Sequence, residues 1–239
     1  QLGIWISPVL DAAAEADNQA EIAKGVALAN QFRSIVDAVS VGNETMVEWS
    51  THKVAVADMA RYLGLVRKAV PQPITTNDNF LFWKSVPNAI AETVDFAAVH
   101  TYPFLDTFYN PTVIDWRQKS VPAEQRAAAM VSAAVTLAKS QVAEVRNALD
   151  SLNLTDLPVV IGETGWTAVD NAGGPSLAFR AHPVNQKMYF DAMQAWAIEG
   201  RKDRHGPKAV FFFQAFDEPW KQGDDGWGLF NKDRQARYV

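Results

Sequence analysis

The stretch Val39-Ser-Val-Gly-Asn-Glu44 decides the fold, because an apolar run of strand length leads directly into a glycine, an amide and a carboxylate. A second stretch, Val159-Val-Ile-Gly-Glu163, repeats this pattern. Strands that are apolar at successive positions are typical of parallel sheets covered on both faces. In a parallel βα barrel, the carboxyl ends of the strands gather on the face that carries the active site. The two stretches therefore predict such a barrel, with Glu44 and Glu163 on its active face.

Short apolar runs like these alternate with helical segments along the whole sequence, which is typical of repeated βα units. The predicted strands are residues 2–6, 35–41, 74–77, 94–100, 159–162 and 209–214. A capping box of Asn18 and Glu21 predicts a helix that starts before Ile22. Further helices are predicted from Met59 to Val70, from near Pro122 to about Leu149, and after Pro183.

Six βα units fall short of the eight in a closed barrel. Because the first predicted strand adjoins Gln1, we expect the two missing strands to precede residue 1, in a longer parent protein. The predicted fold class is thus an α/β (β/α)8 TIM barrel without strands 1 and 2, with residues 1–239 as one catalytic domain. An open doubly wound sheet is the alternative, since six strands suffice for it. No glycine-rich phosphate turn follows the first strand, which counts against a nucleotide-binding version.

The composition excludes several classes of function. The chain has 239 residues and a net charge of −5, without the basic stripe that a nucleic acid partner requires. No apolar run approaches the roughly 20 residues that span a bilayer, so we expect no membrane contact by this chain. The absence of cysteine excludes disulfides and thiolate metal sites but leaves the compartment open. The four histidines lack metal-ligand spacing, and we predict no metal and no cofactor.

The two glutamates each have a structural interpretation as well, since a carboxylate at a strand end can cap the next helix or pair with an arginine. Two of them in matching contexts favour a function, because placing carboxylates close together has an electrostatic cost. Glycoside hydrolysis requires such a pair: one carboxyl group protonates the leaving oxygen while the other attacks the anomeric carbon.

Three motifs carry a resemblance to a known family: Val41-Gly-Asn-Glu44, Gly162-Glu-Thr-Gly-Trp166 and Phe216-Asp-Glu-Pro-Trp-Lys221. In this order and spacing they resemble glycoside hydrolase family 17, whose members are retaining enzymes with catalytic glutamates after barrel strands 4 and 7. The resemblance extends from Gly3-Ile-Trp-Ile-Ser7 to Gly226-Trp-Gly-Leu-Phe230. It implies that the six strands correspond to strands 3 to 8, that Glu44 is the general acid/base and that Glu163 is the nucleophile.

The resemblance also implies contacts with substrate. These are Asn43 at the sugar 2-hydroxyl, Tyr102 near the cleavage point, Trp166 in the groove wall, Phe216, and the pair Glu218 and Lys221, which would orient or tune the acid/base. From position alone, Asn77, Asp78 and Asn79 follow a strand and either bind sugar hydroxyls or form a turn. His100 ends another strand and is either a core histidine or a substrate contact.

Aromatic side chains can stack on sugar rings, although most of them belong in a core. Phe80, Phe82 and Trp83 form either a stacking platform or packing beneath a loop. Residues 103–119 exceed an ordinary connection and form either a loop over the groove or a lid over hydrophobic core. Their aromatic residues are Phe104, Phe108, Tyr109 and Trp116. Asp224 and Asp225 are expected in a solvated turn.

The resemblance implies a retaining, endo-acting enzyme on β-1,3-glucan, with hydrolysis and transfer to a second sugar equally open. Glu44 must begin protonated, and we expect burial and the charge of Glu163 to raise its pKa. We expect the two carboxyl groups roughly 5 to 5.5 Å apart. The alternatives are a transglycosylase with little hydrolysis, a noncatalytic β-glucan-binding domain, and a relative acting on β-1,4 or mannan linkages, in which proline commonly stands where Thr45 does. We expect an extracytoplasmic location, periplasmic or secreted.

Overall fold

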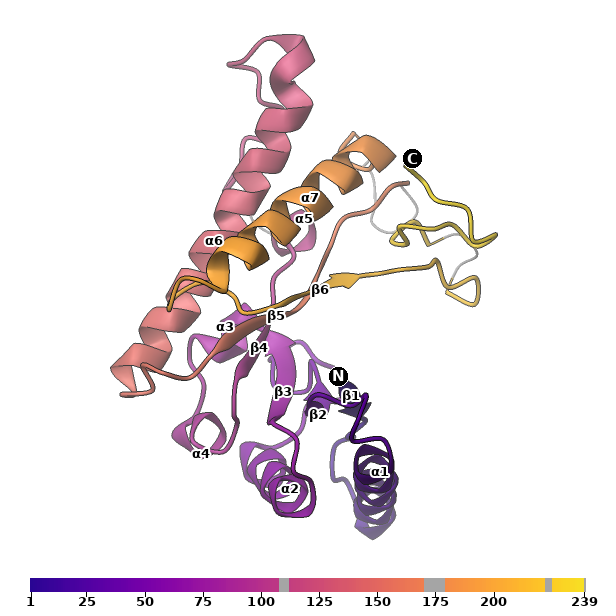
Figure 1. Cartoon of the computed structure of the whole chain (residues 1–239), viewed down its shortest axis with the longest axis vertical. Coiled ribbons are helices and arrows are strands. Elements are labelled where there is room, and N and C mark those ends of the chain that lie inside the picture. Colours follow the sequence, from indigo (N-terminus) through magenta and orange to yellow (C-terminus); the bar gives the residue numbers. More distant parts are fainter. Residues whose placement is uncertain (108–111, 170–178, 222–224, 239) are drawn as a thin grey trace. The chain divides into compact units, whose positions relative to one another are not determined.

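The computed structural model describes residues 1–107, 112–169, 179–221 and 225–238 (Figure 1). The chain divides into two compact units. The first unit comprises Gln1–His100 with Val142–Gly162, and the second comprises Thr101–Gln141 with Glu163–Val239. The prediction that residues 1–239 form a single domain stays a prediction.

The first unit is built on parallel strands that follow one another in sequence order. They are β1 (Leu2–Ile4), β2 (Val39–Asn43), β3 (Ile74–Asn79), β4 (Ala97–His100) and the first four residues of β5 (Val159–Gly165). In register, Leu2 lies opposite Val39, Val39 opposite Ile74, and Asn77 opposite Ala98. The carboxyl ends of β2, β3 and β4 therefore lie at one edge of this sheet.

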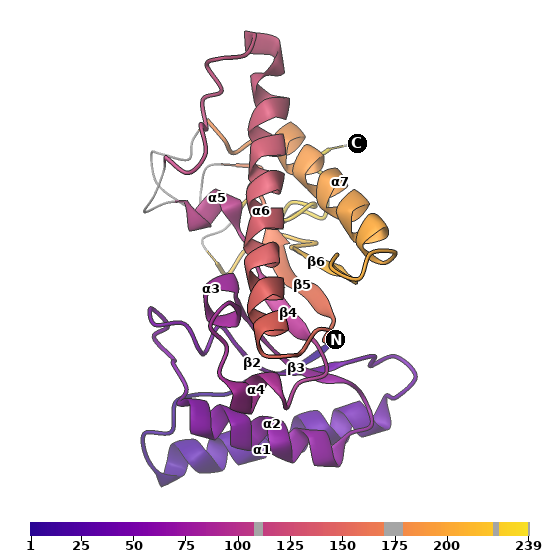
Figure 2. The ribbon, with the colours of Figure 1, turned by 90° about the vertical axis from the view of Figure 1, so that its left-hand side faces the viewer.

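Helices cover one face of the strands in this unit. Figures 1 and 2 show α1 (Ala12–Gln31) and α2 (Val56–Ala69) side by side against β1 to β3, with α4 (Asn88–Ala91) next to α2. Met59, Leu63 and Val66, spaced three or four residues apart on α2, are completely buried. This apolar stripe is what joins the helix to the sheet.

Several boundaries in this unit differ from the sequence predictions, including the end of β1 at Ile4 and the start of β4 at Ala97. α1 begins at Ala12 with Asp11 as its N-cap, so the predicted capping box at Asn18 is wrong. Asn18 lies inside the helix and is buried, and its side chain bonds the backbone of Ser7 and the hydroxyl of Tyr62. The second predicted strand started too early, because Ile35 lies in the turn after α1 and is 71% exposed.

The second unit contains α5 (Pro103–Asp106), η1 (Ala123–Gln125), the start of α6 (Arg126–Ser151), the end of β5, α7 (Pro183–Gly200) and β6 (Val210–Phe213). β6 follows β5 in the strand order, and α7 contacts β6. The predicted helix start at Pro183 is confirmed, as is the long helix that begins after Pro122. The core of the second unit is aromatic and includes Tyr102, Phe104, Trp166, Tyr189 and Trp227.

Within the described ranges, no helix combines the length and apolarity needed to cross a membrane.

Candidate active site

Glu44 lies immediately beyond β2, in a backbone conformation that is unusual for a residue with a side chain. Its φ is +49°, and its backbone N–H donates to the carbonyl of Asn77 at 2.9 Å. Gly42, two residues earlier, has φ +78°, and a Cβ there would lie 2.7 Å from the Met59 methyl group. A glycine is therefore needed at position 42 for the turn that presents Glu44.

His100 is the hydrogen-bonding partner of Glu44. Its Nδ1 lies 3.0 Å from Glu44 Oε1, and the ring is completely buried at the end of β4. The pKa of Glu44 is lowered, chiefly by this hydrogen bond, although burial of the carboxyl group acts in the opposite direction. The prediction that burial and the charge of Glu163 raise its pKa is wrong for this structure, because that prediction overlooked His100.

A second histidine connects the same loop to an exposed tryptophan. His52 Nε2 lies 3.0 Å from the carbonyl oxygen of Asn43. The His52 ring stacks on Trp5, with 5.1 Å between ring centroids, and Trp5 is 53% exposed. An aromatic face thus lies open next to the residue that precedes Glu44. The predicted contact between Asn43 and a sugar 2-hydroxyl stays a prediction.

Asp78 and its neighbours are the last residues of β3, not residues beyond it as predicted, and they hold the backbone around Glu44. The buried Asp78 carboxylate accepts hydrogen bonds from the Met46 and Asn79 N–H groups, both at 2.8 Å. Burial raises the pKa of Asp78 to about 6. Of the two roles weighed for these residues, Asp78 therefore has the turn-forming one. Asn77, a predicted substrate contact, accepts a hydrogen bond from the Gln1 side chain at 3.0 Å.

In the second unit, Tyr102 is the hydrogen-bonding partner of Glu163. The Tyr102 hydroxyl donates to Glu163 Oε2 at 2.8 Å, and the Glu163 carbonyl accepts from the Thr101 N–H at 3.0 Å. Gly165, the last residue of β5, allows close packing against Phe213 at the end of β6, since a Cβ at position 165 would lie 2.2 Å from the Phe213 carbonyl oxygen. The Gly-Glu-Thr-Gly motif thus combines a carboxylate with a position that a side chain cannot occupy.

The tryptophan of that motif does not line an open surface. Trp166 is completely buried, its indole N–H donates to the Arg180 carbonyl at 3.1 Å, and Phe104 packs on its edge. The prediction that Trp166 walls the substrate groove is therefore wrong. Trp227 packs edge-on against Tyr102 at 5.7 Å and holds the ring whose hydroxyl reaches Glu163.

The third motif keeps its predicted pair together. Lys221 and Glu218 form an ion pair, and Phe216 is 40% exposed. Asp225 is buried and accepts from the Gln214 side chain and the Trp227 N–H, so the prediction of a solvated turn is wrong for Asp225. Asp224, Phe108 and Tyr109 lie outside the described residues.

The other aromatic candidates prove to be core. Phe80, Phe82 and Trp83 are at most 9% exposed in α3 (Phe80–Trp83), which supports packing over a stacking platform. Phe104 and Trp116, from the long segment 103–119, are also buried. The sequence analysis missed the roles of His52, Trp5 and His100. The position of His100 at a strand end was a signal for its role.

Each unit therefore carries one of the two predicted carboxylates near the carboxyl end of a strand, in contact with an aromatic or imidazole side chain.

Residues 1–229 match the family described as the BtgE/BtgC glycoside hydrolase domain. The chain belongs to this family. The similar glucan 1,3-beta-glucosidases and β-glucan endohydrolase structures reported next confirm the resemblance to glycoside hydrolase family 17.

Among curated relatives, a glucan 1,3-beta-glucosidase of Arthroderma benhamiae is 26% identical over 99% of this chain and 70% of its own length. Glucan 1,3-beta-glucosidase BGL2 of Candida albicans is 23% identical over 100% of this chain and 72% of its own length. These matches extend the similarity beyond the three motifs to the whole of the chain.

Solved structures confirm the fold. An endo-laminarinase from Formosa Hel1_33_131 is 30% identical, with a TM-score of 0.80 over 93% of this chain. The chain spans 61% of that laminarinase. Two plant beta-glucan endohydrolases, described together, match with a TM-score of 0.59 at 19% identity, over 93% of this chain and 81% of theirs. The six parallel strands thus match those of TIM-barrel glycosidases over most of the chain.

Proposed function

We propose that this member of the glycoside hydrolase family is a retaining, endo-acting β-1,3-glucan glycosidase. In this proposal, Glu44 is the general acid/base and Glu163 the nucleophile. The observation that carries it is the placement of both carboxylates near the carboxyl ends of apolar strands, each hydrogen-bonded to a neighbouring ring, His100 or Tyr102. The activities of the fungal relatives and the laminarinase support β-1,3-glucan as substrate.

In the first step, Glu163 attacks the anomeric carbon as the glycosidic bond breaks, and the proton of Glu44 passes to the leaving oxygen. Tyr102 holds the Glu163 carboxylate through Oε2 and so fixes its rotamer for the attack. In the second step, Glu44 takes a proton from water or from a sugar hydroxyl, whose oxygen bonds to the anomeric carbon while Glu163 departs. Two inversions at this carbon give retention. A carboxyl separation of about 5 to 5.5 Å, which this mechanism requires, stays a prediction.

The acid step requires a protonated Glu44, whereas His100 favours the carboxylate. The side chain of Glu44 is 38% exposed, so water still reaches it in this structure. A bound glucan would remove that water, and desolvation favours the neutral form of a carboxyl group. We propose that substrate binding protonates Glu44, which then donates to Nδ1 of a neutral His100 until the leaving oxygen takes the proton.

Hydrolysis and transfer differ only in what attacks the glycosyl-enzyme, so both follow from the same two carboxylates. A transglycosylase that elongates or branches glucan is therefore the second candidate function. The exposed Trp5 stacks on the His52 ring that contacts the Asn43 carbonyl, which supports sugar binding near Glu44, a feature that both candidates share. We propose an extracytoplasmic location, periplasmic or secreted, because β-glucan is the expected partner.

Covalent trapping tests the catalytic assignment. A laminaribiosyl fluoride carrying fluorine at C2 of the reacting glucose should add its glycosyl mass to the peptide that contains Glu163. Glu163→Gln should abolish the label, and the matched exposed control Glu124→Gln should retain it. Glu44→Ala should regain turnover of an aryl donor when azide is supplied, with a β-glycosyl azide as product. An unlabelled Glu163 in the parent protein would refute the proposed enzymatic function and favour a glucan-binding domain.

Product analysis separates the two candidate functions. Incubation with one defined laminari-oligosaccharide should give only shorter products if water is the acceptor. Products longer than the substrate would exclude pure hydrolysis.

A further inference from the structure

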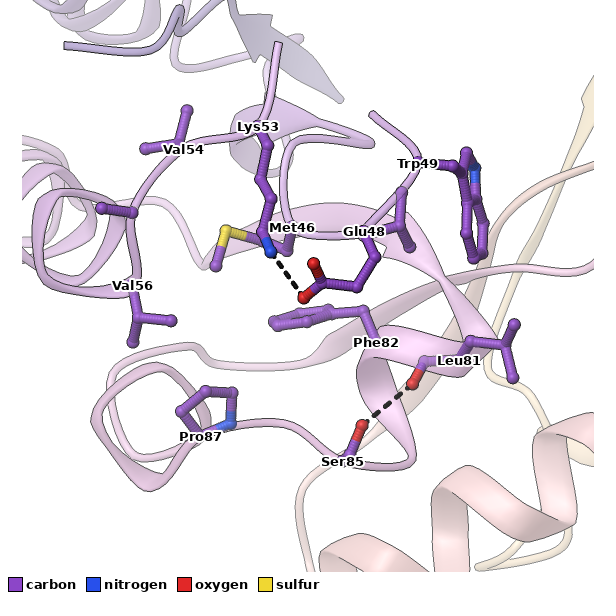
Figure 3. A pocket seen from close by; sticks show the side chains of 12 residues that line it. Met46, Glu48, Trp49, Lys53, Val54, Val56, Leu81, Phe82, Ser85 and Pro87 are labelled. Atoms are coloured by element: carbon purple, nitrogen blue, oxygen red, sulfur yellow. Dashed lines mark hydrogen bonds and ion pairs between the residues drawn. The ribbon is translucent and has the colours of Figure 1, made fainter. Parts of the chain in front are cut away.

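A pocket in the first unit opens between the loop after β2 and the segment that begins with α3 (Figure 3). Its cavity volume is about 410 Å³, within the range of about 300 to 1,000 Å³ that is usual for small-molecule sites. One wall begins at Met46, two residues beyond Glu44, and continues through Trp49 to Val56. The pocket is therefore adjacent in the chain to the proposed acid/base.

Hydrogen bonds fix both walls of this pocket in place. Asp78 accepts from the Met46 N–H on one wall and from the Asn79 N–H at the base of the other. Asn79 in turn caps α3 by accepting from the Leu81 N–H at 3.0 Å. Val54 N–H donates to the Thr45 carbonyl at 2.8 Å and closes the loop on itself. The pocket is thus a built cavity whose two walls share one buried carboxylate.

The lining combines an apolar floor with a polar side and an open indole. Phe82, Met46 and Val54 are at most 8% exposed, whereas Trp49 is 59% exposed. In Figure 3, the ion pair of Lys53 and Glu48 lies near the Phe82 ring. A glucosyl ring has matching chemistry, because its axial C–H groups form an apolar face and its equatorial hydroxyls bond to charged groups. The lining carries both charges, so it favours a neutral polar ligand over an anion or a cation.

We propose that this pocket binds a glucosyl unit of the acceptor glucan, with Trp49 stacked on the sugar ring and the Lys53–Glu48 pair bonded to its hydroxyls. Its role as acceptor site rests on the proposed function of Glu44. The group that an acid/base protonates leaves on its own side, and the wall of this pocket begins two residues beyond Glu44. An acceptor held here presents its hydroxyl to the anomeric carbon: that C–O bond forms, the bond to Glu163 breaks, and the proton passes to Glu44. Occupancy of the pocket then raises transfer relative to hydrolysis.

Binding is tested first, by a measurement that needs no catalysis. In a 15N-labelled sample, the indole N–H signal that disappears in Trp49→Phe identifies Trp49. Addition of laminaritriose should shift this signal, and Trp49→Ala should raise the concentration for half-maximal change of other shifted signals at least fivefold. The matched control Phe32→Ala removes an exposed ring at the end of α1, 41% exposed, and should keep the parent value. A Trp49 signal that does not move would overturn the pocket as a sugar site.

The acceptor role is tested on the trapped glycosyl-enzyme. Laminaritriose should speed its turnover, and Trp49→Ala should raise the half-saturating acceptor concentration about tenfold or more, whereas Phe32→Ala should not. An unchanged acceptor dependence in Trp49→Ala would refute the acceptor role even though the label forms. Absence of any label would instead refute the proposed function and with it the acceptor role, while the indole titration still decides whether the pocket binds sugar.

Discussion

The hydrogen bond between His100 and Glu44 predicts how the pH dependence of catalysis changes when it is removed. His100→Leu places an apolar side chain of similar size in this completely buried site and removes Nδ1, which lies 3.0 Å from Glu44 Oε1. A hydrogen bond to a charged group contributes about 1.5 to 3 kcal/mol, and about 1.4 kcal/mol corresponds to one pKa unit. Because the Glu44 side chain is 38% exposed, solvent reduces the effect to the lower end. We expect the pKa of Glu44 to rise by about one unit.

Two measurements report this change. The basic limb of the kcat/KM profile follows loss of the acid's proton in the free enzyme, so it should move about one unit toward higher pH. Titration of the Glu44 carboxyl carbon by 13C NMR should give the same shift without reference to activity. His100→Asn places an amide nitrogen near the position of Nδ1 and should move the pKa back toward the parent value. A Glu44 pKa that stays constant or falls in His100→Leu would refute the assignment of His100 as the group that lowers it.

Three further predictions follow from the hydrogen bonds of the two units. Tyr102→Phe removes the donor to Glu163 and should lower kcat/KM about 10- to 100-fold in steady-state assays, the equivalent of about 1.5 to 3 kcal/mol; an unchanged value would contradict the positioning role. For Asp78, whose pKa is raised from 3.8 to about 6, ionisation disfavours the folded state. Parent stability relative to Asp78→Asn, measured by urea unfolding, should therefore fall by about 3 kcal/mol as pH rises from about 4 to above 6, and a constant difference would argue against the shift. Arg237→Met leaves the fully buried Asp217 carboxylate without its ion-pair partner and should cost about 3 kcal/mol in the same assay, most of which an added Asp217→Asn should restore.

The two candidate catalytic glutamates could be predicted from the sequence. Buried parallel strands consist almost entirely of apolar residues, so a carboxylate directly after such a run stands out. Glu44 and Glu163 were identified from the apolar runs before them; Glu44 lies just after β2, whereas Glu163 lies inside β5, near its carboxyl end. Strand beginnings were less certain, since an apolar residue is not always buried. Ile35 was assigned to a strand, yet its N–H and that of Val36 donate to the Phe32 carbonyl in a turn.

The hydrogen-bonding partners of these residues, which lie far away in the sequence, were harder to predict than the positions of the candidate catalytic residues themselves. His100 follows Glu44 by 56 residues, and no local pattern joins them. Besides the strand-end position of His100, the geometry of barrels provides a signal, because side chains from alternate strands share a layer. Glu44 follows β2 and His100 ends β4, so the two come from alternate strands. Asn18 could not be found in this way, because its burial in α1 depends on Ser7 and Tyr62, which reach it through the packing of loop and helix.

The backbone at Glu44 shows why local propensity could not predict this site. A glutamate with φ +49° is in the left-handed region, at a cost of roughly 1 to 2 kcal/mol for a residue with a Cβ. Asn77 accepts from the Glu44 N–H, and Asp78 accepts from the Met46 N–H, so hydrogen bonds fix the backbone on both sides of the strained residue. A residue chosen for stability at this position would be glycine. The presence of a carboxylate there, held by a buried acid whose own ionisation is costly, indicates that this turn is arranged to present Glu44 and is compensated by the core beneath it.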